Sequence, residues 1–152
     1  MIIQTEKFGE LNVDEDKIIE FPDALPGFPN LKKFTLLHRK DRDGNDLHTF
    51  AFLQSIENTD IALALIDVSY YLTDYTLNLN DDDLDIIGGF SPEDTLIYNV
   101  MVVPEKLEDI RTNLKAPIVI NSITRKGKQI VMEGDYDIRF HIYKMLKEKV
   151  GE

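Results

Sequence analysis

The sequence contains no cysteine. A chain without cysteine has no disulfide framework, no thiolate metal site and no cysteine nucleophile. No apolar run approaches the roughly 18 residues that a membrane-spanning helix needs. The first ten residues also lack the basic flank and the apolar stretch of a secretory signal. These absences predict a soluble, cytoplasmic protein that is not associated with a membrane.

Positive charge is scarce, with 17 Lys and Arg residues against 28 Asp and Glu residues and a net charge of -11. Such a charge repels phosphate backbones, so we expect no direct binding to nucleic acid and a basic protein as the natural partner. The acids cluster, since residues 77–109 carry nine of them against the single Lys106. These acids either keep the protein soluble or form an acidic face for a partner. The candidates for such a face are Asp81, Asp82, Asp83, Asp85, Glu93, Asp94, Glu105, Glu108 and Asp109.

Motifs of catalysis are also missing. The sequence has no nucleophile elbow, phosphate-binding loop, dinucleotide-binding glycine pattern or zinc-protease motif. Acid–base catalysis by paired carboxylates such as Glu105 and Glu108 requires a cleft and divergent pKa values, so solvated surface acids are the simpler interpretation. We therefore expect a protein that is not an enzyme and that needs no cofactor or metal.

The length of 152 residues predicts a single domain over residues 1–152. Short β-rich segments separated by turn signals predict a mainly β, antiparallel, barrel-like or sandwich fold. The expected strands are residues 2–8, 17–21, 33–39, 48–55, 61–68, 95–103, 117–121 and 129–132.

Helices are expected to be few. Asn80 is a good N-cap for a short helix whose first turn is acidic, and glycines follow at its end. Ser91 and Pro92 repeat this pattern of cap and first helical residue. An apolar stripe predicts an amphipathic C-terminal helix over residues 137–149. The stripe consists of Ile138, Ile142, Met145 and Leu146.

Two charged turns require separate interpretation. Residues 41–46 resemble a calcium loop, but Gly44 is fourth rather than sixth and the twelfth position is Phe52. The Asp-Gly pair instead predicts a hairpin tip that brings His38 and His48 face to face, without an evident third metal ligand. Residues 125–128 are either a phosphate patch or a solvated hairpin turn, and the lack of interleaved aromatic residues favours the turn.

The segment 113–121 is open to two interpretations. Its alternating polar and apolar residues and Pro117 are typical of an edge strand. Period-two alternation then places Ile118 and Ile120 in the core and turns their neighbours outward. The segment is either part of the core or a partner-facing edge. The residues proposed to meet a partner are Asn113, Leu114, Pro117, Val119 and Asn121.

Several short motifs occur together in a specific order. They are Phe8-Gly9-Glu10, Ile18-Ile19-Glu20-Phe21-Pro22, Leu25-Pro26-Gly27-Phe28, Leu53-Gln54-Ser55, Asn113-Leu114-Lys115-Ala116-Pro117-Ile118-Val119-Ile120-Asn121 and Arg125-Lys126-Gly127-Lys128-Gln129. In this order and spacing the chain resembles the FliW family of flagellar assembly factors over about residues 5 to 130. The C-terminal tail is less characteristic of the family.

The resemblance implies a β-barrel-like fold and a partner switch. Proteins of this family bind CsrA, an RNA-binding translational regulator, and so relieve its repression of flagellin messenger RNA. Free flagellin competes for the protein and releases CsrA. We expect a monomer when no partner is bound. The alternative is a general chaperone-like module that binds an exported subunit.

Overall fold

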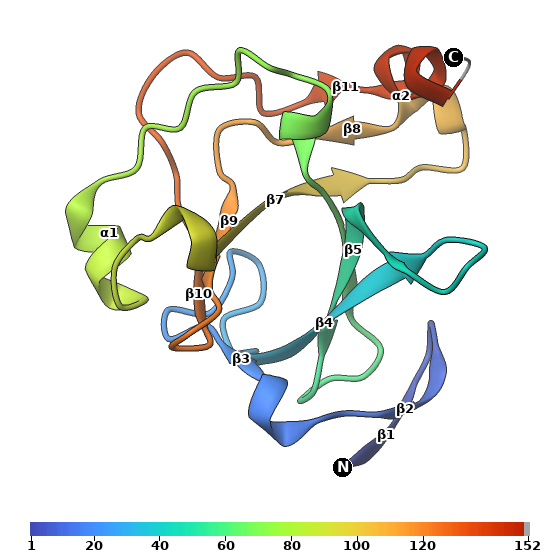
Figure 1. The fold of residues 1–152 in the computed structure, drawn as a ribbon, viewed down its shortest axis with the longest axis vertical. Coiled ribbons are helices and arrows are strands. Elements are labelled where there is room, and N and C mark those ends of the chain that lie inside the picture. The colour runs from blue at the N-terminus through green and yellow to red at the C-terminus, as the bar shows by residue number, and fades with distance from the viewer. Residues whose placement is uncertain (151–152) are drawn as a thin grey trace.

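The computed structural model describes residues 1–150, except for the side chains of His48 and of residues 148–150. The predicted mainly β fold is confirmed (Figure 1). Its strands are β1 (Ile2–Thr5), β2 (Gly9–Asn12), β3 (Ile19–Glu20), β4 (Lys33–Lys40), β5 (Asp46–Ser55), β6 (Ala62–Ile66), β7 (Thr95–Val102), β8 (Arg111–Thr112), β9 (Ile118–Asn121), β10 (Lys126–Gln129) and β11 (Phe140–His141). Its helices are α1 (Asp81–Ile86), α2 (Tyr143–Val150) and the 3-10 turns η1 (Glu15–Lys17), η2 (Val68–Tyr70), η3 (Pro92–Asp94) and η4 (Leu107–Asp109).

Seven of these strands close into a barrel. The order around the ring is β7, β6, β5, β4, β3, β10 and β9, and β9 pairs with β7 again. All neighbours are antiparallel except β3 and β10, which run parallel and pair at Glu20 and Lys126. The hairpin β1–β2 forms a separate two-stranded sheet below the ring (Figure 1). The barrel-like prediction is confirmed by this closure.

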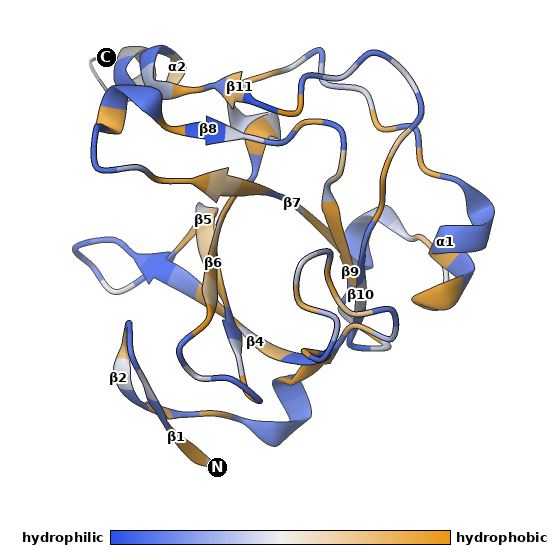
Figure 2. Cartoon of the chain, turned by 180° about the vertical axis from the view of Figure 1, so that it is seen from behind, coloured by the Kyte–Doolittle hydropathy of each residue, from blue (hydrophilic) through white to orange (hydrophobic). Residues whose placement is uncertain are grey.

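Apolar side chains from strands all round the ring fill the barrel. Phe21, Phe34, Leu53 and Ile118 are fully buried members of this central cluster. The loop of residues 22–31 packs Leu25, Phe28 and Leu31 against the same cluster, and Figure 2 shows it within the ring of strands. Ala24 and Gly27 adopt positive φ angles of 58° and 86°, which fold this loop back on itself. Residues 22–31 therefore plug one end of the barrel.

Two smaller apolar clusters lie on the outer surface of the barrel. One joins Ile66 and Ile110 to Ile142 near α2. The other contains Val119, Ile87 and Ile130, with Leu84 of α1 packed against it. Each cluster covers the outward face of a barrel strand with chain that is distant in sequence.

Some predicted elements were misplaced. The C-terminal helix begins at Tyr143 rather than residue 137, because residues 140–141 pair with β8 as β11 and Ile138 is 56% exposed. The strand predicted at 129–132 lies at 126–129, so most of the basic turn belongs to β10. The two-residue strands β8 and β11 were missed, since two residues show no periodicity.

The structure confirms the predicted hairpin tip and the predicted cap of α1. Lys40 pairs with Asp46 across β4 and β5, and the Asp41 carboxylate accepts hydrogen bonds from the backbone N–H groups of Asp43 and Asn45. Residues 41–45 are thus a hairpin tip, as predicted. Asn80 caps α1 through a 2.8 Å hydrogen bond from the Asp83 backbone N–H to its side-chain oxygen. Among the described residues, no helix is long and apolar enough to cross a membrane.

Candidate functional site

Strand β9 is not an edge. Its residues pair with β10 on one side and with β7 on the other, so its backbone groups are all engaged. The predicted alternation is confirmed, because Ile118 and Ile120 enter the barrel whereas Val119 joins the outer cluster beneath α1. Of the two interpretations of this segment, the structure supports a place in the core, and the outward exposure of Val119 and Asn121 that a partner-facing edge requires is wrong. Val119 is 0% exposed and Asn121 is 7% exposed, since α1 and the chain around it cover this face.

The side chain of Asn121 makes only internal contacts. Its oxygen accepts hydrogen bonds from the backbone N–H groups of Ile123 and Thr124, at 2.9 Å and 3.2 Å. Its amide nitrogen donates to the carbonyl oxygen of Gly89. Asn121 therefore joins the β9–β10 turn to the end of α1 and presents nothing to a partner.

The residues before β9 are likewise engaged internally. The Asn113 side-chain oxygen accepts hydrogen bonds from the backbone of Lys115 and Ala116, while Leu114 and Pro117 are buried. The Tyr75 hydroxyl donates a 2.6 Å hydrogen bond to the Leu114 carbonyl oxygen. Burial is the main cause that raises the pKa of Tyr75. Asn113, Leu114 and Pro117 thus hold a loop in place, and their predicted contact with a partner has no exposed apolar surface to support it.

The predicted acidic residues form two groups rather than one face. Asp81 and Asp82 are exposed on α1, whereas Asp83 is half-buried and lies 3.4 Å from the Lys128 ammonium. The exposed Glu105 and Glu108 follow β7 and lie next to α2. Figure 1 shows α1 and α2 on opposite sides of the molecule. A single partner surface therefore does not include both groups.

The predicted pair of histidines is not supported by the strand register. His38 pairs with Ala51 across β4 and β5, and the side chain of His48 lies outside the described part of the chain. A 3.1 Å hydrogen bond joins His38 Nε2 to the Tyr98 hydroxyl. Among the residues that the structure describes, no three His, Asp or Glu side chains gather as metal ligands would.

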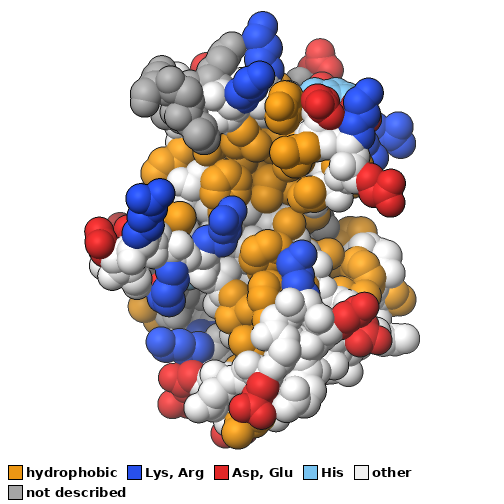
Figure 3. All heavy atoms as spheres, turned by 90° about the vertical axis from the view of Figure 1, so that its right-hand side faces the viewer, with side chains coloured by type: hydrophobic (Ala, Val, Ile, Leu, Met, Phe, Trp, Pro, Cys, Tyr) orange, Lys and Arg blue, Asp and Glu red, His pale blue; other side chains and the backbone are white. Residues whose placement is uncertain are grey.

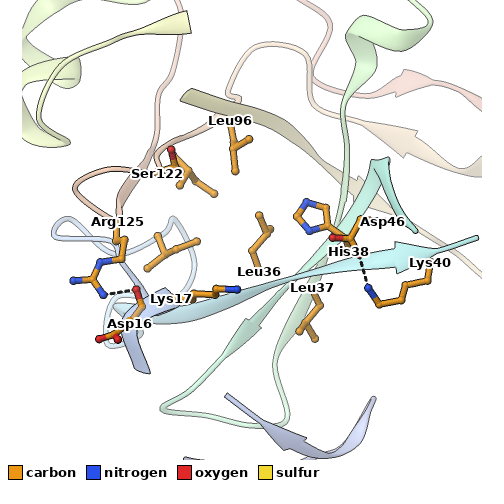
Figure 4. A pocket seen from close by; sticks show the side chains of 12 residues that line it. Asp16, Lys17, Leu36, Leu37, His38, Lys40, Asp46, Leu96, Ser122 and Arg125 are labelled. Atoms are coloured by element: carbon orange, nitrogen blue, oxygen red, sulfur yellow. Dashed lines mark hydrogen bonds and ion pairs between the residues drawn. The ribbon is translucent and has the colours of Figure 1, made fainter. Parts of the chain in front are cut away.

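The barrel mouth opposite the plug contains a cavity of about 550 Å³. Figure 4 shows Lys17 extending into it toward Leu36. Lys40 is instead paired with Asp46, and the Arg125 guanidinium donates to the backbone carbonyl of Asp16. Two of the three Lys and Arg residues that line this cavity are therefore bonded within the chain.

A second recess, of about 530 Å³, lies on the outer face of strands β5, β6 and β7. The small residues Ala62 and Ala64 of β6 form its floor. Phe52 on β5 and Met101 on β7 pair with Ala64 on either side and form the walls. Alanine between larger neighbours leaves a concave surface, which we call the β5–β7 groove.

Most residues that line the β5–β7 groove are apolar, and one of its borders is basic. Its charged lining residues are Lys7 and Arg39, and the Lys7 ammonium lies 4.8 Å from the centre of the Phe52 ring. Figure 3 shows an apolar stripe across this side of the molecule, with Lys and Arg side chains along it and most acids further out. An apolar recess of this size with convergent charges is a typical binding surface.

Sequence reasoning missed the β5–β7 groove, although a signal was present. Residues 62–66 read Ala-Leu-Ala-Leu-Ile, so this strand is apolar on both faces. One face packs in the barrel through Leu65, and the other needs either a covering element or a partner. The small alanines at every second position mark the second face as the floor of a recess.

Comparison with known proteins agrees with the fold. The family model described as FliW protein matches residues 2–142. The flagellar assembly factor FliW of Caldicellulosiruptor saccharolyticus is 35% identical over 98% of this chain and 95% of its own length. The FliW of Caldanaerobacter subterraneus is 34% identical over 97% and 96% of the two chains.

A solved structure gives the same result in three dimensions. The crystal structure of a flagellar assembly factor FliW superposes with a TM-score of 0.81 and 29% identity, covering 93% of this chain and 96% of that one. Sequence family, near-complete coverage and barrel topology all agree, and the chain therefore belongs to the FliW family of flagellar assembly factors.

Proposed function

We propose that this chain is a cytoplasmic partner switch that binds CsrA and flagellin in turn. Bound CsrA no longer represses flagellin messenger RNA, and flagellin that accumulates displaces CsrA and restores repression. Membership of the FliW family is the observation that carries this proposal. The activity is a change of binding partner and requires no catalysis.

The charge of the molecule supports this proposal. A net charge of -11 attracts a basic RNA-binding protein and repels RNA from the resulting complex. Asp81, Asp82 and Asp85 are exposed on α1, and Glu105 and Glu108 are exposed beside α2. Either group suits a basic surface. The two groups lie on opposite sides of the molecule (Figure 1).

The β5–β7 groove supplies the other requirement of a switch, which is a surface suited to protein. An exposed apolar recess with polar borders is the usual core of a protein interface. The β5–β7 groove and the acidic groups thus offer surfaces of different chemistry on one small domain. This combination favours a binding protein over an enzyme.

The test is size-exclusion chromatography of the chain alone, with purified CsrA, with purified flagellin, and with both. We expect a monomer alone, a complex with each partner, and loss of the CsrA complex when flagellin is added. Retention of a flagellin messenger RNA fragment by CsrA, measured in parallel, should fall when the chain is present. Binding to flagellin without any binding to CsrA would replace the switch with a chaperone-like role.

Salt dependence and charge reversal locate the CsrA surface. We expect association with CsrA to slow as salt rises, because exposed charges are screened within about 10 Å at 0.1 M salt. Reversing Asp81 and Asp82 to Lys is compared with reversing Glu105 and Glu108 to Lys. The pair that slows association marks the contact surface. If neither pair changes the rate, CsrA binds elsewhere.

A further inference from the structure

We propose that the β5–β7 groove binds an amphipathic helix of flagellin, with carboxylates on the helix facing Lys7 and Arg39. The inference rests on the proposed function, because it assigns one of the two partners to a surface. Its basis is the shape of the recess, the pairing of its strands and the charge at its border.

The width of the β5–β7 groove suits a helix. Its walls stand on β5 and β7, which are separated by β6 alone. Two strand spacings place the backbones of β5 and β7 about 9.6 Å apart, close to the roughly 10–12 Å diameter of a helix with its side chains. Ala62 and Ala64 rise less from the sheet than Phe52 and Met101, so a row of side chains from a helix can enter between these two walls.

The pairing of the strands argues against an extended peptide. A peptide that binds as an added strand needs an open sheet edge. Strands β5, β6 and β7 are each paired on both sides, so their backbone groups are engaged within the barrel. The β5–β7 groove therefore offers side chains rather than backbone, which is how a helix is recognised.

The positive charges at the border of the β5–β7 groove favour an acidic binding partner. In the part of the chain that the structure describes, neither Lys7 nor Arg39 lies within ion-pair distance of a carboxylate. Two such cations repel a basic RNA-binding regulator and attract carboxylates. Of the two proposed partners, we therefore assign flagellin to the groove.

Charge also sets the direction of the bound helix. Lys7 and Arg39 lie on the β4–β5 side of the groove, where Lys7 covers Phe52. On the other side, Val103 and Ile110 line the groove, and the chain between them carries Glu105 and Glu108. A helix with carboxylates over the β4–β5 side and Lys or Arg over the β7 side matches both borders.

The test uses two kinds of variant of the full chain. Ala64→Phe fills the groove floor, and Lys7→Glu with Arg39→Glu reverses its basic border. Each is titrated calorimetrically with purified flagellin monomer and with purified CsrA. We expect both variants to weaken flagellin binding by about tenfold or more, as loss of an interface centre does, and to leave CsrA binding within about twofold.

Matched controls change the same groups on other surfaces. The control for the groove floor is Val131→Phe, at a position that is 60% exposed. The control for the basic border is Lys126→Glu with Arg139→Glu, at two exposed positions. These variants should bind both partners as the parent does. Melting temperatures confirm folding, and the reversal at exposed Lys7 and Arg39 keeps the test valid if Ala64→Phe is unstable.

Each outcome decides the proposal. Flagellin binding that is unchanged in both groove variants overturns it, and so does loss of CsrA binding in place of flagellin binding. If the parent itself binds neither partner, the proposed function fails first and the assignment of the groove fails with it. Hydrogen exchange on bound flagellin should show protection in one continuous helical segment, and protection of an extended segment would contradict the helix.

Discussion

The outer faces of two parts of the barrel differ in what covers them. On β9 the outward Val119 is completely buried, because Ile87 at the end of α1 and Ile130 after β10 pack over it. On β6 the outward Ala64 is only half-buried and forms the floor of the β5–β7 groove. Both strands alternate regularly. The comparison teaches that alternation determines which face a residue occupies, whereas distant chain determines whether that face meets solvent.

The largest expected loss of stability comes from Val119→Lys, which places a charge on the covered outer face of β9. Lysine at this position buries an unpaired charge beneath α1, so we expect to lose roughly 4 kcal/mol or more of the free energy of unfolding, out of the 5–15 kcal/mol of a typical domain. Urea denaturation measures the loss. Val131→Lys, at a 60% exposed position, is the control. A Val119→Lys variant that melts with the parent would show that α1 does not cover β9 in solution.

The sequence predicted the barrel because its strands alternate and are separated by turn signals such as Asp43-Gly44. It predicted that Ile118 and Ile120 face the core and that their neighbours face outward. It did not predict that Val119 is covered, because α1 precedes it by more than 30 residues and no local pattern records the contact. The edge-strand interpretation failed because β7 pairs with the side of β9 that its hairpin neighbour β10 leaves open, and β8 separates β7 from β9 in the sequence.

The candidate site was less predictable than the fold. The motifs that carry the family resemblance are mostly structural. The Gln54 amide is fully buried and donates to the carbonyl oxygens of Thr59 and Ile61 in the β5–β6 turn. The groove residues, by contrast, are ordinary alanines and phenylalanines spread over three strands. Only their register in the folded sheet brings them together.

The next prediction concerns Tyr98 in the barrel core and the dependence of stability on pH. Burial, with smaller contributions from Asp67 and Tyr70, raises the pKa of Tyr98 to about 12. Neutral Tyr98 therefore stabilises the fold fully below pH 10, and this contribution is lost as the pH rises through 12. The loss amounts to about 2–3 kcal/mol at 1.36 kcal/mol per pKa unit. Unfolding by urea between pH 9 and pH 12 measures it.

The matched variant Tyr98→Phe removes the titrating hydroxyl but retains the ring. Its free energy of unfolding should fall less steeply over the same pH range. If the two slopes are equal, other tyrosines and lysines account for the alkaline loss and the interior around Tyr98 is more open than the structure shows.

A third prediction tests how tightly the covered side is packed. A Cβ atom at Gly127 of β10 would lie 2.7 Å from Cζ of the buried Phe21 ring. Gly127→Ala should therefore cost about 1–3 kcal/mol, as overpacking of a core does. Thermal unfolding measures the change. Gly134→Ala is a poor control because of its positive φ, so Lys126→Ala, at the exposed neighbouring position of β10, serves instead. A neutral Gly127→Ala would indicate that Phe21 can move.

The smallest change in stability is expected for a substitution on the open outer face of β6. Ala64→Lys makes the same kind of change as Val119→Lys, but the long side chain can lie along the groove and extend its ammonium group into water. We expect a change in the free energy of unfolding within about 1 kcal/mol. A loss comparable to that of Val119→Lys would show that the groove is closed in the free protein, and the comparison between the two faces would then disappear.

The single parallel pairing in the ring affects the order of folding. Strands β3 and β10 meet at one residue pair, Glu20 and Lys126, which are separated by most of the chain. Loop closure over such a distance is slow, so the hairpins β4–β5 and β5–β6 are expected to form first and this junction last. Newly synthesised chains would hold an open, curved sheet until β10 emerges from the ribosome. Amide groups at this junction should then be among the first in the barrel to exchange with solvent.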